Sequence, residues 1–132
     1  MSEEIRESFE DYLKAILSIS KRKKGGWVSN SEIAEFLRVK PSSVTNMLYK
    51  LKKEKFISWQ PRKKVRLTSK GKTIANNMIK YSTELKFFFQ NLLKLKSKKE
   101  ISKLCCLIEH HLTPEVYFAL EDLNSKMLDL NT

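Results

Sequence analysis

The sequence predicts a mainly α-helical protein, with a winged helix-turn-helix domain over residues 1–72 and a second helical domain over residues 73–132. The composition, with only 3 Gly and 3 Pro beside 41% hydrophobic residues, is typical of a helical globular protein. In the first half, a short helical pattern, a short turn and a second helical pattern follow one another, and two short alternating runs come directly after them.

The first helix is predicted over residues 3–22, because apolar side chains recur there at steps of three and four residues. This apolar stripe consists of Ile5, Phe9, Leu13, Ile16 and Leu17. Basic residues 21–24 crowd the end of the helix, where positive charge suits the helix dipole. Gly25 and Gly26 then end it.

The helix-turn-helix is predicted from two helix-start signals. Ser29 with Glu32 three residues later is a capping box, and Pro41 suits the first position of the following helix. Val39 and Lys40 form the turn between the two helices. The second helix turns four apolar side chains inward and leaves its small polar side chains on other faces; the inward residues are Val44, Met47, Leu48 and Leu51.

The wing is predicted as a β-hairpin formed by residues 56–59 and 65–68 and joined by the basic segment 60–64. Three more helices follow in the sequence. A long helix is expected over roughly residues 70–95. The others are expected over residues 98–112 and 114–128, the last opened by Pro114.

Nearly all of the net charge lies in one segment. Residues 36–72 contain 12 Lys or Arg and one acid, Glu54, for a net charge of +11, which equals that of the whole chain. Concentrated positive charge is typical of a protein that binds a polyanion, because each neutralised phosphate releases counterions. The alternative is a solvated basic face that serves solubility, where such charge is usually more scattered.

The second helix of the helix-turn-helix has the chemistry of a DNA-reading helix. A helix that enters the major groove needs small hydrogen-bonding residues at its start, and Asn can pair both edges of adenine. Lysines beside it suit phosphates, and a basic wing tip suits the DNA backbone or the minor groove. Ser and Thr after a proline are also ordinary helix caps. The predicted DNA-binding residues are Lys40, Ser42, Ser43, Thr45, Asn46, Lys50, Arg62, Lys63 and Lys64.

A second group of residues has the chemistry of a metal site. Cys106, Glu109 and His110 fall within one helical turn, and thiolate, carboxylate and imidazole together suit a divalent transition ion. The alternative is a partly buried Cys, a surface Glu and two His that are satisfied by other contacts. The adjacent Cys105 is expected to pack as a small hydrophobic residue rather than to form a disulfide with its neighbour.

Five short motifs occur in an order and at separations that are specific as a set: EDYL at residues 10–13, SEIAEFL at 31–37, PSSVTNML at 41–48, LTSKGK at 67–72 and CLIEHH at 106–111. With these motifs the chain resembles the diphtheria toxin repressor family, the DtxR/MntR metal-dependent transcription factors, over nearly its whole length. The resemblance implies a dimeric regulator with an N-terminal winged helix and a helical region for dimerisation and metal binding.

The resemblance also implies a set of metal ligands. Asp11 falls on the first-helix ligand, and its carboxylate resembles the manganese-sensing branch. Cys106 falls where iron sensors have Cys and manganese sensors have an acid, while Glu109 and His110 fall on positions shared by both branches. We therefore expect one divalent ion per subunit. The thiolate favours Fe(II), with Mn(II), Zn(II) or Co(II) as alternatives.

Three departures from the family pattern bear on a second metal site. Thr83 stands where the family has a ligand His, Phe87 where the iron branch has an acid, and Lys14 where the manganese branch has a first-helix Glu. The sequence therefore predicts that the second metal site is lost. The SH3-like domain of the iron branch is also not expected in this chain.

The functional prediction is a metal-dependent DNA-binding transcription regulator, a repressor of metal-uptake genes that binds a palindromic operator as a homodimer in the cytoplasm. The absence of a long apolar run argues against a membrane span. The alternative is a winged-helix regulator that is metal-independent or responds to another signal, as MarR-like proteins do. An enzyme that uses Cys106 and His110 is not expected, because neither an oxyanion site nor a substrate pocket is visible in the sequence.

Overall fold

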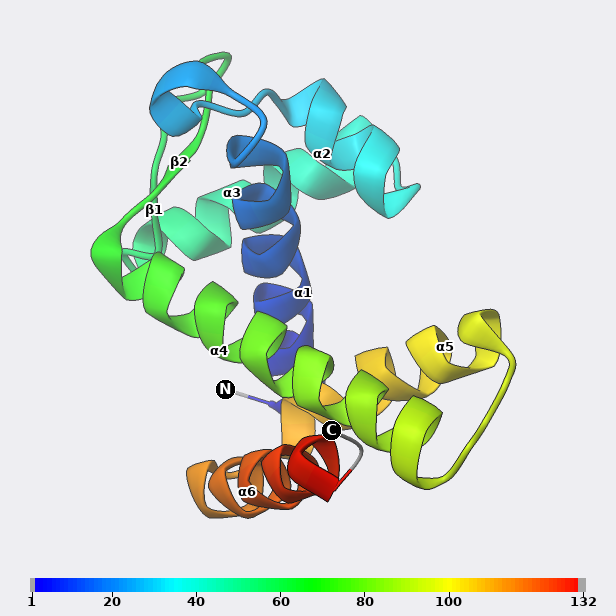
Figure 1. The fold of residues 1–132 in the computed structure, drawn as a ribbon. Coiled ribbons are helices and arrows are strands. Elements are labelled where there is room, and N and C mark those ends of the chain that lie inside the picture. The colour runs from blue at the N-terminus through cyan, green and yellow to red at the C-terminus, as the bar shows by residue number, and fades with distance from the viewer. Residues whose placement is uncertain (1, 131–132) are drawn as a thin grey trace. The chain divides into compact units, whose positions relative to one another are not determined.

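The computed structural model describes residues 2–130 and divides into two compact units between Asn76 and Asn77. The helix α4 (Ser69–Phe87) begins in the first unit and continues into the second (Figure 1). The predicted fold class is confirmed: helices dominate, and the sheet is limited to a small two-stranded wing. No helix of the described residues is long and apolar enough to cross a membrane.

The first unit contains the expected winged helix-turn-helix. Its elements in chain order are α1 (Glu3–Ser20), a 3₁₀ turn (Lys24–Gly26), α2 (Asn30–Leu37), α3 (Pro41–Lys53), β1 (Ile57–Ser58), β2 (Arg66–Leu67) and the start of α4. The first helix ends at Ser20, two residues before the predicted end. Gly25 and Gly26 follow with φ of +77° and +71°, values that glycine adopts at little cost.

The local helix-start signals are present as predicted. The Ser29 hydroxyl accepts from the Glu32 backbone N–H at 3.1 Å, and the Glu32 carboxylate accepts from the Ser29 backbone N–H at 3.1 Å. Each side chain therefore satisfies a backbone donor that the helix itself leaves unpaired. Pro41 occupies the start of α3, where its missing N–H costs nothing.

The core of the first unit is built from the inward faces of its three helices and the wing. The apolar side chains of this unit that have no exposed surface include Leu13, Ile16, Val28, Ile33, Val44, Leu48, Leu51 and Val65. Burial of one such side chain stabilises the fold by about 1.5–3 kcal/mol. Because α1, α2, α3 and the wing all contribute, this core sets the position of α3 relative to the wing.

The wing is shorter than the predicted runs. Ile57 pairs with Leu67 and Ser58 with Arg66 in an antiparallel ladder of two residues on each strand. A separate bridge joins Val28 to Val65, with N···O distances of 2.8 and 2.7 Å in the two directions. The segment before α2 is therefore hydrogen-bonded to Val65, directly before β2, a pairing that the predicted hairpin did not include.

The second unit contains the rest of α4, a π-helical turn (Phe88–Leu92), α5 (Lys98–Ile108), a 3₁₀ turn (Glu109–His111) and α6 (Pro114–Leu130). Its core consists of Leu85, Ile101 and Cys105, with Phe89, Ile108, Leu112 and Leu120 packed against them. Cys105 has no exposed surface, as expected of a packed residue.

Two predicted helices of this unit end differently. The long helix does not continue to residue 95, because the Leu93 N–H donates to the Phe88 carbonyl five residues earlier, and Lys94 then adopts a φ of +60°. The helix predicted over 98–112 is α-helical only to Ile108, and the next three residues tighten into the 3₁₀ turn. In α6, which extends two residues beyond the predicted end, the Asn124 side-chain amide donates to the Glu84 carboxylate at 2.7 Å and joins it to α4.

Candidate DNA interface and metal ligands

The leading turns of α3 present polar side chains to solvent. Five of the predicted DNA-binding residues have exposed side chains here. They are Lys40, directly before the helix, and Ser42, Ser43, Asn46 and Lys50 on it. The opposite face of the same helix supplies Val44, Leu48 and Leu51 to the core. The helix is thus held by its apolar face while its hydrogen-bonding groups stay available for a partner.

Thr45 differs from its neighbours, because its hydroxyl is engaged inside the protein. It is half-buried, donates to the Pro41 carbonyl at 3.1 Å and accepts from the Asn30 side-chain amide at 2.8 Å. A hydroxyl has one donor and two acceptor positions, so the donor and one acceptor are used. Of the predicted DNA-binding residues, Thr45 therefore has the least hydrogen-bonding capacity left for a base.

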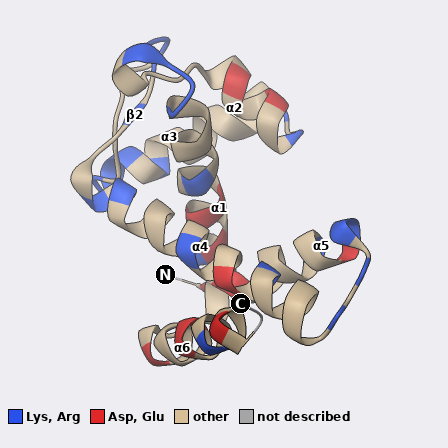
Figure 2. Ribbon diagram, in the orientation of Figure 1, with Lys and Arg blue, Asp and Glu red and all other residues tan. Residues whose placement is uncertain are grey.

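The wing tip is basic and exposed. Arg62, Lys63 and Lys64 are all exposed, and Arg62 adopts a φ of +67° at the turn, where the Lys63 N–H donates to the Gln60 carbonyl at 2.9 Å. Figure 2 shows that Lys and Arg gather over the wing and the turn after α1, whereas the acidic residues of this unit lie mainly on α1 and α2. The charge segregation predicted from the sequence is therefore also present in the fold of this unit.

A cleft of about 540 Å³ separates the wing tip from the helix-turn-helix. Thr45 and the three basic wing residues line this cleft. Its other lining residues were not among the predicted DNA-binding residues; they are Ser29, Asn30, Ser31, Tyr49, Trp59 and Pro61. The Tyr49 and Trp59 rings meet edge to face, with centroids 4.8 Å apart. These residues come from α2, α3 and the wing, so no local pattern in the sequence could have grouped them.

The start of α2 carries a paired carboxylate. Lys23 forms an ion pair with Glu32, and the hydrogen bond from Lys23 together with the one from the Ser29 backbone lowers the pKa of Glu32 to about 2. The carboxylate therefore stays ionised throughout the neutral range. Its negative charge stabilises the positive end of the α2 dipole.

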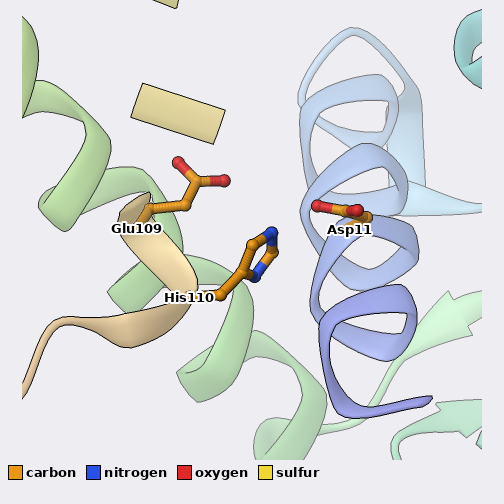
Figure 3. A group of neighbouring side chains, drawn as sticks. All are labelled: Asp11, Glu109 and His110. Atoms are coloured by element: carbon orange, nitrogen blue, oxygen red, sulfur yellow. The ribbon is translucent and has the colours of Figure 1, made fainter. Parts of the chain in front are cut away.

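In the second unit, Glu109 and His110 lie side by side in the 3₁₀ turn that follows α5 (Figure 3). Glu109 has no exposed surface and His110 is 5% exposed. A carboxylate oxygen of Glu109 and a ring nitrogen of His110 lie within 4.8 Å of each other. Two adjacent, buried donor side chains of this kind are suited to a divalent cation, because burial of an ionised carboxylate needs a compensating positive charge or hydrogen bonds.

Cys106 lies in the last turn of α5, before the 3₁₀ turn that holds Glu109 and His110. Its side chain is exposed, whereas Cys105 is buried, and Cys106 is not among the donor residues that lie within 4.8 Å of Glu109 and His110. The buried face of α5 runs through Ile101, Cys105 and Glu109 at steps of four residues. Cys106 is one residue off this face, which rotates its side chain by about 100° about the helix axis.

The remaining sequence-predicted ligand, Asp11, belongs to the first unit, where it lies exposed on α1 (Figure 3). Lys14, one turn later, is half-buried. At the positions where the resemblance places ligands of a second site, Thr83 is exposed and its hydroxyl donates to the Ile79 carbonyl at 2.8 Å, and Phe87 is half-buried. Neither a threonine bonded to its own helix nor a phenylalanine is a suitable metal ligand.

Together, the exposed polar start of α3, the basic wing and the buried donor pair define a winged helix-turn-helix protein with donor side chains for a metal. The sequence profile described as "Iron dependent repressor, N-terminal DNA binding domain" matches residues 4–65. The chain is 37% identical over 106 residues to the HTH-type transcriptional regulator MntR of Bacillus velezensis, a match that covers 80% of this chain and 72% of that protein. The chain belongs to the DtxR/MntR family of metal-dependent transcription regulators.

Two further comparisons agree with this assignment. An uncharacterised HTH-type transcriptional regulator of Methanocaldococcus jannaschii is 32% identical over 123 residues, which cover 93% of this chain and 97% of that protein. The solved structure of the manganese regulator SloR is 27% identical, with a TM-score of 0.73 over 87% of this chain and 52% of that one. The chain spans about half the length of this solved relative.

Proposed function

We propose that this protein is a metal-dependent, DNA-binding transcription regulator that represses genes for metal uptake. One observation supports the DNA-binding half above all others: the polar start of α3 is exposed beside a basic wing, while its apolar face is fixed in the core. Membership of a family of metal-dependent regulators supports the metal-dependent half.

The DNA contacts divide into two kinds. Ser42, Ser43 and Asn46 would enter the major groove, with Asn46 the best candidate for adenine because its amide offers both a donor and an acceptor. The lysines of α3 and the basic wing tip would contact phosphates and so set affinity and its salt dependence; they are Lys40, Lys50, Arg62, Lys63 and Lys64. Thr45 would act mainly by holding the start of α3 in place.

One divalent ion would be held by Asp11, Glu109 and His110. Cys106, the fourth ligand expected from the sequence, would have to turn toward them to take part, because its side chain is exposed and off the buried face of α5. The buried carboxylate and imidazole of Glu109 and His110 support this set, since hard and borderline donors suit Mn(II), Fe(II) and Zn(II). Fe(II) is favoured over Mn(II) if the Cys106 thiolate takes part, because thiolate is the softer ligand.

The protein would act as a homodimer through its second unit. Large apolar side chains of α5 and α6 are more than half exposed, namely Leu107, Val116, Phe118, Leu128 and Leu130. A surface of this kind is typical of a subunit interface. A two-fold dimer would present two α3 helices to two half-sites about one helical turn apart, so the operator would be palindromic.

The proposed metal ligands belong to different units, and sharing one ion would couple metal binding to DNA binding. Asp11 belongs to the unit that carries α3, whereas Glu109 and His110 belong to the other. If both units share one ion, the entropy cost of ordering the two DNA-reading helices is reduced before DNA binds. Linkage then requires that operator DNA raises the affinity for metal by the same factor. A regulator of this kind acts where chromosomal DNA lies, and we place it in the cytoplasm.

The decisive experiment is operator binding by the wild type and by Cys106→Ala, His110→Ala and His111→Ala, each with Fe(II), Mn(II), Zn(II) or a chelator. His111→Ala is the matched control, because His111 is an exposed neighbour of His110. We expect metal to tighten wild-type binding, and His110→Ala to lose metal affinity by at least about tenfold. Equal binding with and without chelator would instead support the metal-independent regulator.

A further inference from the structure

A second cleft, also of about 540 Å³, lies against the wing. It shares Trp59, Lys63 and Lys64 with the cleft between the wing tip and the helix-turn-helix, which we call the DNA-facing cleft. Both tryptophans of the chain, Trp27 and Trp59, contribute to it, together with Lys52, Lys63 and Lys64. Its other lining residues are Ser58 and Gln60, so no described residue that lines it is acidic. Two indole rings and three ammonium groups around one cleft are complementary to a ligand that is both flat and negatively charged.

The two indole rings are held in place from outside the cleft. The Arg66 guanidinium lies over the Trp27 ring, 5.6 Å from its centroid, and the Tyr49 ring meets Trp59 at an interplanar angle of 82°. Trp59 is 7% exposed and Trp27 is 40% exposed. One ring thus forms a fixed wall, and the other offers a large aromatic surface to an incoming molecule.

We propose that this cleft binds a small planar aromatic anion, such as an aromatic carboxylate, and that its binding weakens the hold on DNA. The aromatic ring would stack on an indole, and the carboxylate would pair with Lys52 and the wing lysines. Lys63 and Lys64 line both this cleft and the DNA-facing cleft. An anion that engages these two ammonium groups withdraws them from DNA phosphates, so the two ligands compete.

The second half of this proposal rests on the proposed DNA-binding function, whereas ligand binding itself does not. The chain's two tryptophans make ligand binding directly observable, because each contributes one indole N–H signal to a ¹⁵N–¹H NMR spectrum. Titration with 2-naphthoate should shift both signals in a saturable way. The uncharged 2-naphthamide, which has the same ring system, should bind about five- to tenfold more weakly because it forms no ion pair.

Lys52 and Lys53 provide a matched pair of variants. Both are exposed lysines in the last turn of α3, but only Lys52 lines the cleft. Lys52→Gln should raise the dissociation constant for 2-naphthoate about fivefold, and Lys53→Gln should leave it unchanged. Each variant loses one positive charge near DNA, so operator affinity without 2-naphthoate should fall equally in both.

In an operator-binding assay, 2-naphthoate should weaken DNA binding by the wild type and by Lys53→Gln more than by Lys52→Gln. The proposal is overturned if 2-naphthoate leaves both indole signals in place, or if 2-naphthamide binds as tightly. Normal operator binding alongside unmoved indole signals would leave the proposed regulator function intact.

Discussion

The side-chain amide of Asn30 donates a hydrogen bond of 2.8 Å to the hydroxyl of Thr45, which joins the first residue of α2 to the second turn of α3. The Thr45 hydroxyl in turn donates a hydrogen bond of 3.1 Å to the Pro41 carbonyl. The two helices of the helix-turn-helix are therefore joined by a hydrogen bond in addition to their apolar contact. These hydrogen bonds limit what the Thr45 hydroxyl can contribute to DNA recognition.

Thr45→Val should lower the free energy of unfolding by about 1 kcal/mol, because valine keeps the shape of threonine but removes the hydroxyl that Asn30 and Pro41 use. Chemical denaturation measures this, with Ser43→Ala at an exposed position of the same helix as the control. The base preference of the operator should stay nearly unchanged in Thr45→Val. Asn46→Ala should relax the preference at one base pair by about 1–3 kcal/mol. A change of base preference in Thr45→Val would assign its hydroxyl to the DNA instead.

Gly71 should tolerate no side chain, although it lies in the helix α4. A Cβ added there would meet the Phe56 carbonyl oxygen at 2.1 Å. The close approach is fixed by Thr68, whose backbone N–H donates to that carbonyl at 3.0 Å and whose hydroxyl donates to the Lys55 carbonyl at 2.7 Å. An ordinary Gly→Ala change inside a helix stabilises it by about 0.5–1 kcal/mol.

Gly71→Ala should therefore destabilise the protein by about 1–3 kcal/mol instead of stabilising it, because the backbone must shift to make room for the added methyl group. Lys72→Ala, at an exposed position of the same helix, is the control and should change stability by less than about 0.5 kcal/mol. Thermal or denaturant unfolding measures both. If Gly71→Ala raised the unfolding midpoint, the contact between α4 and the start of the wing would be looser than the structure shows.

Much of the first unit could be predicted because its signals are local. Ser29, Glu32 and Pro41 mark helix starts through contacts within four residues, and they lie where the sequence places them. The role of Thr45 could not be predicted in the same way, since its partner Asn30 is fifteen residues earlier. The cleft walls formed by Tyr49 and Trp59 likewise depend on how the wing packs on α3.

The second unit was harder to predict for the same reason. The helical spacing that grouped Cys106, Glu109 and His110 assumes a regular α-helix, but the helix tightens into a 3₁₀ turn at Glu109. Helical periodicity in the sequence also does not show which face of α5 is buried. The core formed by Leu85, Ile101 and Cys105 fixes that face, and Leu85 comes from a different helix.

The capping carboxylate of α2 makes stability depend on pH. The pKa of Glu32 in the folded protein is about 2, below its ordinary value of 4.5, because of the hydrogen bonds from Lys23 and Ser29. A lowered pKa means that its stabilising contribution is complete above pH 4.5 and is lost as pH falls from 4.5 toward 2. Glu32→Gln should therefore unfold more easily than the wild type at pH 7, and the difference should shrink below pH 4. Unfolding midpoints at pH 7, 5 and 3 check this, and a constant difference would contradict it.

Lys14 provides a test of the predicted loss of the second metal site. It follows Asp11 by three residues on α1, so both side chains project from the same side of the helix. The resemblance to the manganese branch assigns a carboxylate to this position, and an ammonium group there would repel a second cation. Lys14→Glu should therefore raise the stoichiometry of Mn(II) binding from one to two ions per subunit, as measured by isothermal titration calorimetry. Lys14→Gln removes the charge without supplying a ligand and should keep the stoichiometry at one. If Lys14→Glu also binds a single ion, Lys14 does not occupy the position of a missing ligand, and its charge has no part in excluding the second cation.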